Sequence, residues 1–206
     1  QNQSISHSSR SIYTIPVVVH VIHVGQAVGI TSNISDLQIQ EAIDGANKRF
    51  RNLIGNGTTD IEVEFCLATR DPNGFTTNGI KRVDGRSVTK YLNAGIGING
   101  ACDCLSSARE DSIKGLSIWP NTSYYNIWVV NSVCNGLAGG YAQYPGATSS
   151  LDGTVVVYSQ FNHDDVSLTH ELGHGFFLYH TFQGSIATLC PTTLICPSDN
   201  ILNCGS

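Results

Sequence analysis

The chain has 206 residues and a mass of 22.1 kDa, which is enough for one domain with a hydrophobic core. Hydrophobic residues make up 41% of the sequence and charged residues 13%, so the composition excludes an intrinsically disordered chain. The net charge of −5 argues against a nucleic-acid-binding surface, and no apolar run approaches the roughly 20 residues of a membrane span.

The N-terminal quarter predicts a polar arm, one buried strand and one helix. Residues 1–11 are polar and rich in serine, which is typical of a flexible arm. Residues 15–24 form a continuous β-branched apolar run, the pattern of a strand that is buried on both faces. Ser35 and Gln38 predict a capping box at a helix start, and apolar side chains then recur at helical spacing up to about Arg51.

The middle of the chain predicts two further strands on either side of a long mixed region. Residues 61–68 alternate and then become apolar, which indicates a second strand. The Asp-Pro-Asn-Gly sequence at 71–74 indicates a turn. A short helix is predicted near residues 106–113. Residues 126–131, centred on Trp128, indicate the next strand.

The last third of the chain predicts two strands and a helix before the pattern becomes irregular. Residues 139–144 are flanked by glycine and proline, which suits a short strand at the edge of a sheet. Residues 154–159 form another apolar β run, and residues 167–179 have a helical pattern. This order of elements predicts an α/β domain with a mixed, twisted sheet and helices on one or both faces.

Cysteine usage indicates a protein that works outside the cytosol. Seven cysteines in a chain of low charge are typical of a secreted protein with disulfide bonds, although the sequence does not give their pairing. The odd count leaves one thiol free, or paired with a cysteine beyond this chain. A zinc site is the alternative for the last three cysteines, but their spacing lacks the close CxxC pair of structural zinc sites. The seven are Cys66, Cys102, Cys104, Cys134, Cys190, Cys196 and Cys204.

The helix predicted at residues 167–179 carries the residues with catalytic chemistry. His170 and His174 are four residues apart, so both imidazoles lie on one helix face and can bind the same zinc ion. Zinc with an open fourth position lowers the pKa of a bound water to about 7. Glu171 is offset by one position, so it can lie beside this water and take its proton as a general base.

His180 decides between two interpretations of this segment. In a continuous helix, His180 would lie about 15 Å from His170 along the axis and on another face. It reaches the same ion only if the helix stops near Phe177 and the chain turns sharply. Without that break, the histidines would be surface residues of an unrelated secreted domain.

The motif HExxHxxxxxHTF resembles the metzincin metallopeptidases, and the longer string HELGH-x3-LYHTF is most similar to the pappalysin (cytophagalysin) family. The resemblance extends along the chain to about Gln183. It implies a metzincin-like α/β fold: a twisted mixed β-sheet with an antiparallel edge strand, a backing helix and an active-site helix. The further segments that agree with the family are IPVVVHVIH, EFCLATRDPNG, NIWVVN, GGYAQYPGA and DGTVVVY.

The resemblance also implies a function and a set of site residues. The implied function is that of a secreted zinc-dependent endopeptidase acting on a peptide or protein substrate, with His170, His174 and His180 as metal ligands and Glu171 as the catalytic base. The edge strand is implied to bind extended substrate, and such a strand does offer unpaired N–H and C=O groups to a peptide. The substrate-binding residues expected there are Gly139, Gly140, Tyr141, Ala142, Gln143 and Tyr144.

Two departures from the family pattern bear on activity. Metzincins usually carry glycine at the helix break, where this chain has Phe177 at a cost of roughly 1–2 kcal/mol, and Gly175 weakens the helix nearby. Metzincins also have a methionine turn after the third histidine, but this chain has no methionine. We therefore expect residues 12–180 to form the zinc-binding catalytic subdomain and residues 181–206 the start of an incomplete C-terminal subdomain. The alternative is an inactive fragment or a catalytically weak binding module on the metzincin scaffold.

The remaining polar residues have mainly structural interpretations. His20 and His23 are three residues apart in a predicted strand, so their side chains point to opposite faces and a shared metal is not expected. Asp164 and Asp165 favour the start of the following helix rather than a metal site. Calcium is a second cofactor that the resemblance allows, at Asp199 with nearby carbonyl groups, although no regular calcium loop is visible.

Overall fold

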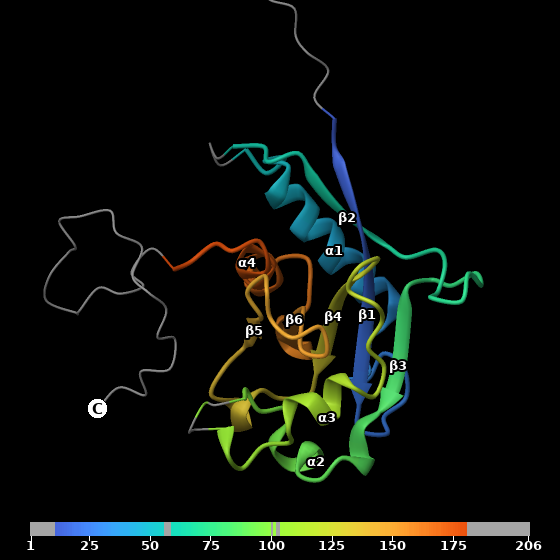
Figure 1. Cartoon of the computed structure of the whole chain (residues 1–206), viewed down its shortest axis with the longest axis vertical. Helices are drawn as coiled ribbons and strands as arrows, with labels where there is room; N and C mark the ends of the chain where they lie inside the picture. The colour runs from blue at the N-terminus through green and yellow to red at the C-terminus, as the bar shows by residue number, and fades with distance from the viewer. Residues whose placement is uncertain (1–10, 56–58, 100, 102–103, 181–206) are drawn as a thin grey trace, which may run out of the picture.

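The computed structural model describes residues 11–55, 59–99, 101 and 104–180, and its centre is a six-stranded sheet (Figure 1). The strand order is β2-β1-β4-β6-β5, and β3 pairs with the C-terminal half of β1. Every pairing is parallel except that of β5 with β6, so β5 is an antiparallel edge strand. The strands are β1 (Tyr13–His23), β2 (Val63–Leu67), β3 (Ile80–Asp84), β4 (Tyr125–Val130), β5 (Gly140–Ala142) and β6 (Thr154–Val157).

Helices cover both faces of this sheet. No helix among the described residues has the length and apolarity that crossing a bilayer requires. The α-helices are α1 (Asp36–Phe50), α2 (Tyr91–Ala94), α3 (Glu110–Lys114) and α4 (Ser167–Gly175). The 3-10 helices are η1 (Gly85–Ser87), η3 (Cys134–Gly136) and η4 (Tyr158–Gln160).

The sheet separates two hydrophobic cores. Along β4, Ile127 and Val129 face one core, whereas Trp128 and Val130 face the other. Helices α1 and α4 cover the first face, and α2 and α3 lie on the second (Figure 1). The residues of β1 between positions 17 and 22 are all fully buried, which confirms the prediction from their continuous apolar run.

The α/β fold class predicted from the sequence is confirmed, but strand β3 and helix α2 were missed, and several elements are shorter than predicted. Strand β3 was missed because its five residues include Lys81, Arg82 and Asp84, which hide the strand pattern. Helix α2 is a single turn without a periodic signal. The helix predicted at residues 167–179 is wrong at its C-terminus, since α4 ends at Gly175.

The predicted capping box at the start of α1 is half formed. The Ser35 hydroxyl accepts a hydrogen bond from the Gln38 backbone N–H at 3.1 Å, as expected of an N-cap. The Gln38 side chain, however, donates to the Phe161 carbonyl oxygen at 2.9 Å. This bond ties α1 to the segment that leads into α4, a partner that local sequence cannot reveal.

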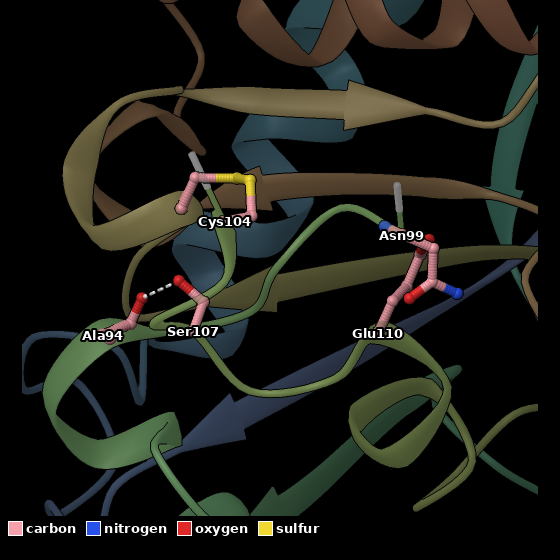
Figure 2. The surroundings of a disulfide bond; sticks show 6 residues. Ala94, Asn99, Cys104, Ser107 and Glu110 are labelled. Carbon is pink, nitrogen blue, oxygen red and sulfur yellow. Dashed lines mark hydrogen bonds between the residues drawn. A yellow bond between two sulfur atoms is a disulfide. The ribbon is translucent and has the colours of Figure 1, made fainter. Parts of the chain in front are cut away.

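One disulfide bond lies on the α2–α3 side of the sheet. Cys104 is bonded to Cys134, with the two Cα atoms 4.5 Å apart, and this pair joins the loop after α2 to η3 (Figure 2). Close by, the Ser107 hydroxyl donates to the Ala94 carbonyl oxygen at 3.1 Å. Cys66 has an exposed free thiol. One disulfide among the described residues therefore agrees with the predicted use of cysteine in disulfide bonds. The other four cysteines lie outside the described residues.

His20 is a core residue of β1 and not part of a metal site. Its ring stacks on Trp128 with the centroids 5.1 Å apart, and its Nε2–H donates to the Asn126 side-chain oxygen at 2.9 Å. Burial lowers the pKa of His20 to about 4. His23 instead accepts a hydrogen bond from the Gly25 N–H at the end of the strand.

The unfolded chain binds a proton on His20 near pH 6.5, whereas the folded chain binds it only near pH 4. We therefore expect His20 to lower the free energy of unfolding as the pH falls between these values. The loss should reach up to about 3 kcal/mol at pH 4. The measurement is urea unfolding between pH 7 and pH 4 on the wild type and on His20→Phe. The difference between the two pH profiles isolates this residue, and parallel profiles would contradict the prediction.

Candidate metal centre

Three imidazoles converge at the C-terminal end of α4. The Nε2 atoms of His170 and His174 are 3.1 Å apart, and the Nε2 of His180 lies 3.0 Å from the first and 3.1 Å from the second. Among the described residues this is the one group of three or more His, Cys, Asp or Glu side chains whose ligand atoms come close enough to hold an ion. The structure thus brings together the three histidines singled out in the sequence.

The convergence depends on how α4 ends. The Leu178 N–H donates to the Gly173 carbonyl at 3.1 Å, and the Phe177 N–H donates to the His174 carbonyl at 2.9 Å. These two bonds are the pair that defines a Schellman motif, in which the residue after the helix cap takes a left-handed conformation. Phe177 occupies that position with φ of 69°. The chain therefore reverses where the sequence requires it to, and His180 returns to the helix.

Aromatic contacts accompany the strained conformation of Phe177. Its ring lies 5.8 Å from the Tyr144 ring and 5.2 Å from the Tyr179 ring, both at steep interplanar angles that aromatic pairs favour. Tyr144 also makes an edge contact with the His174 ring at 5.7 Å. These contacts supply stabilisation that a glycine would lack and so offset part of the cost of the positive φ.

Gly175 serves close packing and does not itself break the helix. A Cβ atom at this position would lie 2.0 Å from the hydroxyl oxygen of Tyr125, which is bonded to the Thr154 hydroxyl at 2.7 Å. Any larger residue would push the end of α4 away from the sheet. Gly175 therefore allows α4 to approach β4 closely, while the reversal of the chain falls at Phe177.

The same turn also orients one of the imidazoles. His174 Nδ1–H donates to the Leu178 carbonyl oxygen at 2.6 Å, so its Nε2 carries the lone pair and faces the other two rings. Such a bond to the second ring nitrogen is the usual support of a metal-binding histidine. Burial lowers the pKa of His170 and of His180, and the neighbouring imidazoles lower both further. The neutral form, which binds metals, is favoured.

The donor set fits a zinc ion. Three neutral nitrogens about 3 Å apart leave a point roughly 2 Å from each, which is the usual zinc–imidazole distance. Three lone pairs directed at one another would otherwise repel, so an ion between them accounts for the arrangement. Nothing in the described residues supports calcium, and Asp199 lies outside them.

Glu171 lies beneath the edge strand. The residue is only 8% exposed, and burial raises the pKa of its carboxyl group to about 7. A Cβ at Gly140 would lie 3.1 Å from Glu171 Cγ and 2.7 Å from the Val155 carbonyl oxygen, so only glycine allows this close approach. The backbone of β5 thereby passes directly beside the predicted general base.

One edge of β5 has no paired strand among the residues that the structure describes. The Gly139 carbonyl accepts from the Val157 N–H at 2.8 Å, and the Gln143 N–H donates to the Gly153 carbonyl at 3.1 Å, so these residues bond toward β6. Alternate residues of an antiparallel strand bond to opposite sides, which directs the backbone groups of Gly140 and Ala142 away from β6. No strand of the described ranges pairs with that side. The six residues predicted to bind substrate therefore divide into two sets by backbone direction.

Helix α1 fixes the segment that leads into α4. The Arg49 guanidinium donates to the His163 and Asp164 carbonyl oxygens, both at 2.9 Å. Asp165 accepts from the Ser167 N–H at 2.7 Å, which agrees with the predicted role of the acidic residues at the helix start. Leu168 and Leu172 then pack into the core that α1 shares. The helix that carries His170 and His174 is consequently held by hydrogen bonds at its N-terminal approach and by packing in the core.

Sequence reasoning missed the residues that support the edge strand from the other face of the sheet. Glu110 and Lys114 are both fully buried, although the sequence indicated only a short helix there. Their spacing of four residues was the one signal available, and most such pairs lie on exposed helix surfaces. Burial of a charged pair depends on tertiary contacts, so the sequence alone did not reveal it.

Comparisons with known proteins agree with the α/β fold. The family model described as pregnancy-associated plasma protein-A matches residues 108–199. Mature mirolysin of Tannerella forsythia, solved with a cleaved peptide, is 29% identical with a TM-score of 0.63, over 85% of this chain and 67% of that one. The structure of mirolysin in complex with a ligand named compound 9 gives the same values. A promirolysin variant is 30% identical with a TM-score of 0.63, over 84% of this chain and 58% of that one. No curated protein matches the chain.

Because Phe177 has a positive φ, we expect the protein to be more stable with glycine than with alanine at this position. Both Phe177→Gly and Phe177→Ala remove the aromatic ring, so their difference reports the backbone strain of a Cβ-bearing residue. Phe177→Gly should be more stable by about 1 kcal/mol. Chemical unfolding of the two variants measures this difference. Equal stabilities would mean that the turn is not left-handed at this residue.

Proposed function

The chain belongs to the pappalysin family of metzincin metallopeptidases, and on this premise we propose that it is the zinc-binding catalytic part of a secreted endopeptidase. The observation that carries the proposal is the convergence of three histidine Nε2 atoms within 3.1 Å of one another. The buried Glu171 directly follows the first of these histidines in the sequence. His170, His174 and His180 would hold the zinc ion. When bound, zinc supplies Lewis acidity that polarises the scissile carbonyl and lowers the pKa of a water molecule.

Glu171 would handle the protons of the reaction. Its carboxylate takes a proton from water while the water oxygen forms a bond to the carbonyl carbon of the peptide. As the C–N bond breaks, Glu171 passes that proton to the departing amine nitrogen. Its burial beside Gly140 keeps bulk water away from the carboxyl group and places it next to the strand on which the peptide would lie.

The substrate would be a peptide segment lying extended along the open side of β5. Gly140 and Ala142 have their backbone groups directed to that side, so they would bond to the peptide backbone and set its register. Tyr141 and Gln143, from the same predicted set, direct their backbone groups toward β6, so they would support the strand and not bond to the peptide backbone. The cleaved peptide in mature mirolysin supports peptide as the substrate class.

The proposed organisation follows the sequence-based division of the chain. Residues 12–180 would form the zinc-binding subdomain, whereas the C-terminal subdomain expected to start at residues 181–206 lies outside the described residues. The Cys104–Cys134 disulfide supports secretion, because disulfides persist in oxidising compartments. The alternative of a weak binding module loses one of its two motives, since Phe177 adopts the conformation that the family's glycine provides.

Zinc binding should require the third histidine. We expect the wild type to bind one equivalent of zinc and His180→Ala to bind it more than about 100-fold more weakly, because even changes behind the ligands cost 10–100-fold. The measurement is competition with a chromogenic chelator. His23→Ala, which removes a histidine outside the cluster, is the matched control and should bind zinc like the wild type. Unchanged affinity in His180→Ala would remove this residue from the ligand set.

Glu171→Gln should separate metal binding from turnover. The amide keeps the size of the side chain but cannot take a proton, so we expect zinc affinity to be kept and peptide cleavage to fall by about 10²–10⁴-fold. Cleavage of a mixed peptide library, read by mass spectrometry with and without chelator, gives both the rate and the metal dependence. Equal activity of wild type and variant would disprove the role of Glu171.

A further inference from the structure

A buried ion pair lies behind the edge strand, on the face of the sheet opposite α4. Glu110 and Lys114 both belong to α3, their side chains are fully buried, and Lys114 Nζ is 2.7 Å from Glu110 Oε1. Two charges taken out of water cost several kcal/mol each unless every donor and acceptor finds a partner. Such a pair seldom adds net stability to the fold.

The partners of this pair belong to the β5–β6 hairpin and to the loop after α2. Glu110 Oε1 accepts from the Gln143 side-chain Nε2–H at 3.0 Å, and Oε2 accepts from the Asn99 N–H at 3.3 Å. Figure 2 shows Asn99 and Glu110 side by side near the disulfide. Lys114 Nζ donates to the Leu151 carbonyl oxygen at 2.5 Å.

These contacts reach the hairpin at three places. Gln143 directly follows β5, Leu151 lies in the loop before β6, and the Tyr141 ring, in the middle of β5, lies over Lys114 at 5.1 Å. Lys114 also faces the Trp128 ring of β4 at 4.8 Å, so the same ammonium group contacts the sheet interior. The edge strand is therefore connected to the centre of the sheet by side chains as well as by its ladder with β6.

Strand geometry links this network to the open edge. Side chains alternate between the two faces, so those of Tyr141 and Gln143 point to the ion pair, while Gly140 faces Glu171 on the other side. A strand of three residues that pairs with one other strand in the described part of the chain has few ladder bonds to keep it in place. The contacts from the α3 side therefore add to the few ladder bonds that hold this strand.

We propose that Glu110, Lys114 and Gln143 form a positioning network. This network sets the register of the edge strand and the distance of its backbone from Glu171, and so prepares the strand to bind extended peptide substrates. The inference rests on the proposed peptidase function. None of the three touches the reacting atoms; they act through the backbone of Gly140 and Ala142. Gln143 joins the ion pair to the end of β5 by a hydrogen bond, so its side chain positions the strand from the α3 side of the sheet.

The test uses Gln143→Met in the full chain, because this change removes the amide donor, keeps the side-chain length and leaves the ion pair intact. Gln38→Met is the matched control: it removes another half-buried glutamine amide, whose bond to the Phe161 carbonyl lies on the opposite face. Amide hydrogen exchange at Tyr141 and Gln143 should become about tenfold faster in Gln143→Met, as expected for the loss of a hydrogen bond to a charged group. It should stay unchanged in Gln38→Met.

Peptide kinetics supply the second readout. For a peptide long enough to lie along β5, we expect KM to rise about tenfold in Gln143→Met while kcat stays within about twofold, since the general base and the metal ligands are untouched. Unchanged exchange together with unchanged KM would overturn the proposal. If the wild type cleaves no peptide, the proposed function fails by itself. The exchange rates would then still decide whether this network holds the strand.

Discussion

The structure of the candidate site depends on the reversal of the chain after α4. A helix carries His170 and His174 on one face by its own periodicity, but no continuous helix can add His180 to them. The Schellman bonds from Phe177 and Leu178 end the helix and turn the chain back over its last turn. The same turn places the Leu178 carbonyl where it fixes the His174 ring, so one local motif both assembles the donor set and selects the nitrogen that faces it.

The position of this turn in space is set by the sheet. Gly175 allows the end of α4 to touch Tyr125 of β4, and Arg49 of α1 holds the segment that enters the helix. Glu171 then lies beside Gly140 of the edge strand. Successive residues of a strand face opposite sides of the sheet. The short strand β5 therefore contacts α4 with one face and the buried Glu110–Lys114 pair with the other. The three histidines, Glu171 and the edge strand are thus parts of a single packed assembly.

Much of this arrangement could be predicted from residues close together in sequence. The continuous apolar run of β1, the Ser35 cap and the spacing of the three histidines are local patterns with a direct physical meaning. The condition that the helix must break near Phe177 also followed from helix geometry, and the structure meets it with a positive φ at this residue. Elements without a strong pattern, such as the charged strand β3, were missed because pairing along β1, and not composition, stabilises them.

The sequence by itself determined the α/β class, the three histidines with their neighbouring carboxylate, and the need for a chain reversal, because each follows from periodicity or spacing along a few turns of backbone. Tertiary structure alone decided which backbone groups of β5 face outward, why Gly175 and Gly140 must lack a side chain, and that Glu110 and Lys114 lie buried behind the edge strand. These properties arise where residues far apart in the chain meet, so burial and close approach, and not local propensity, set them.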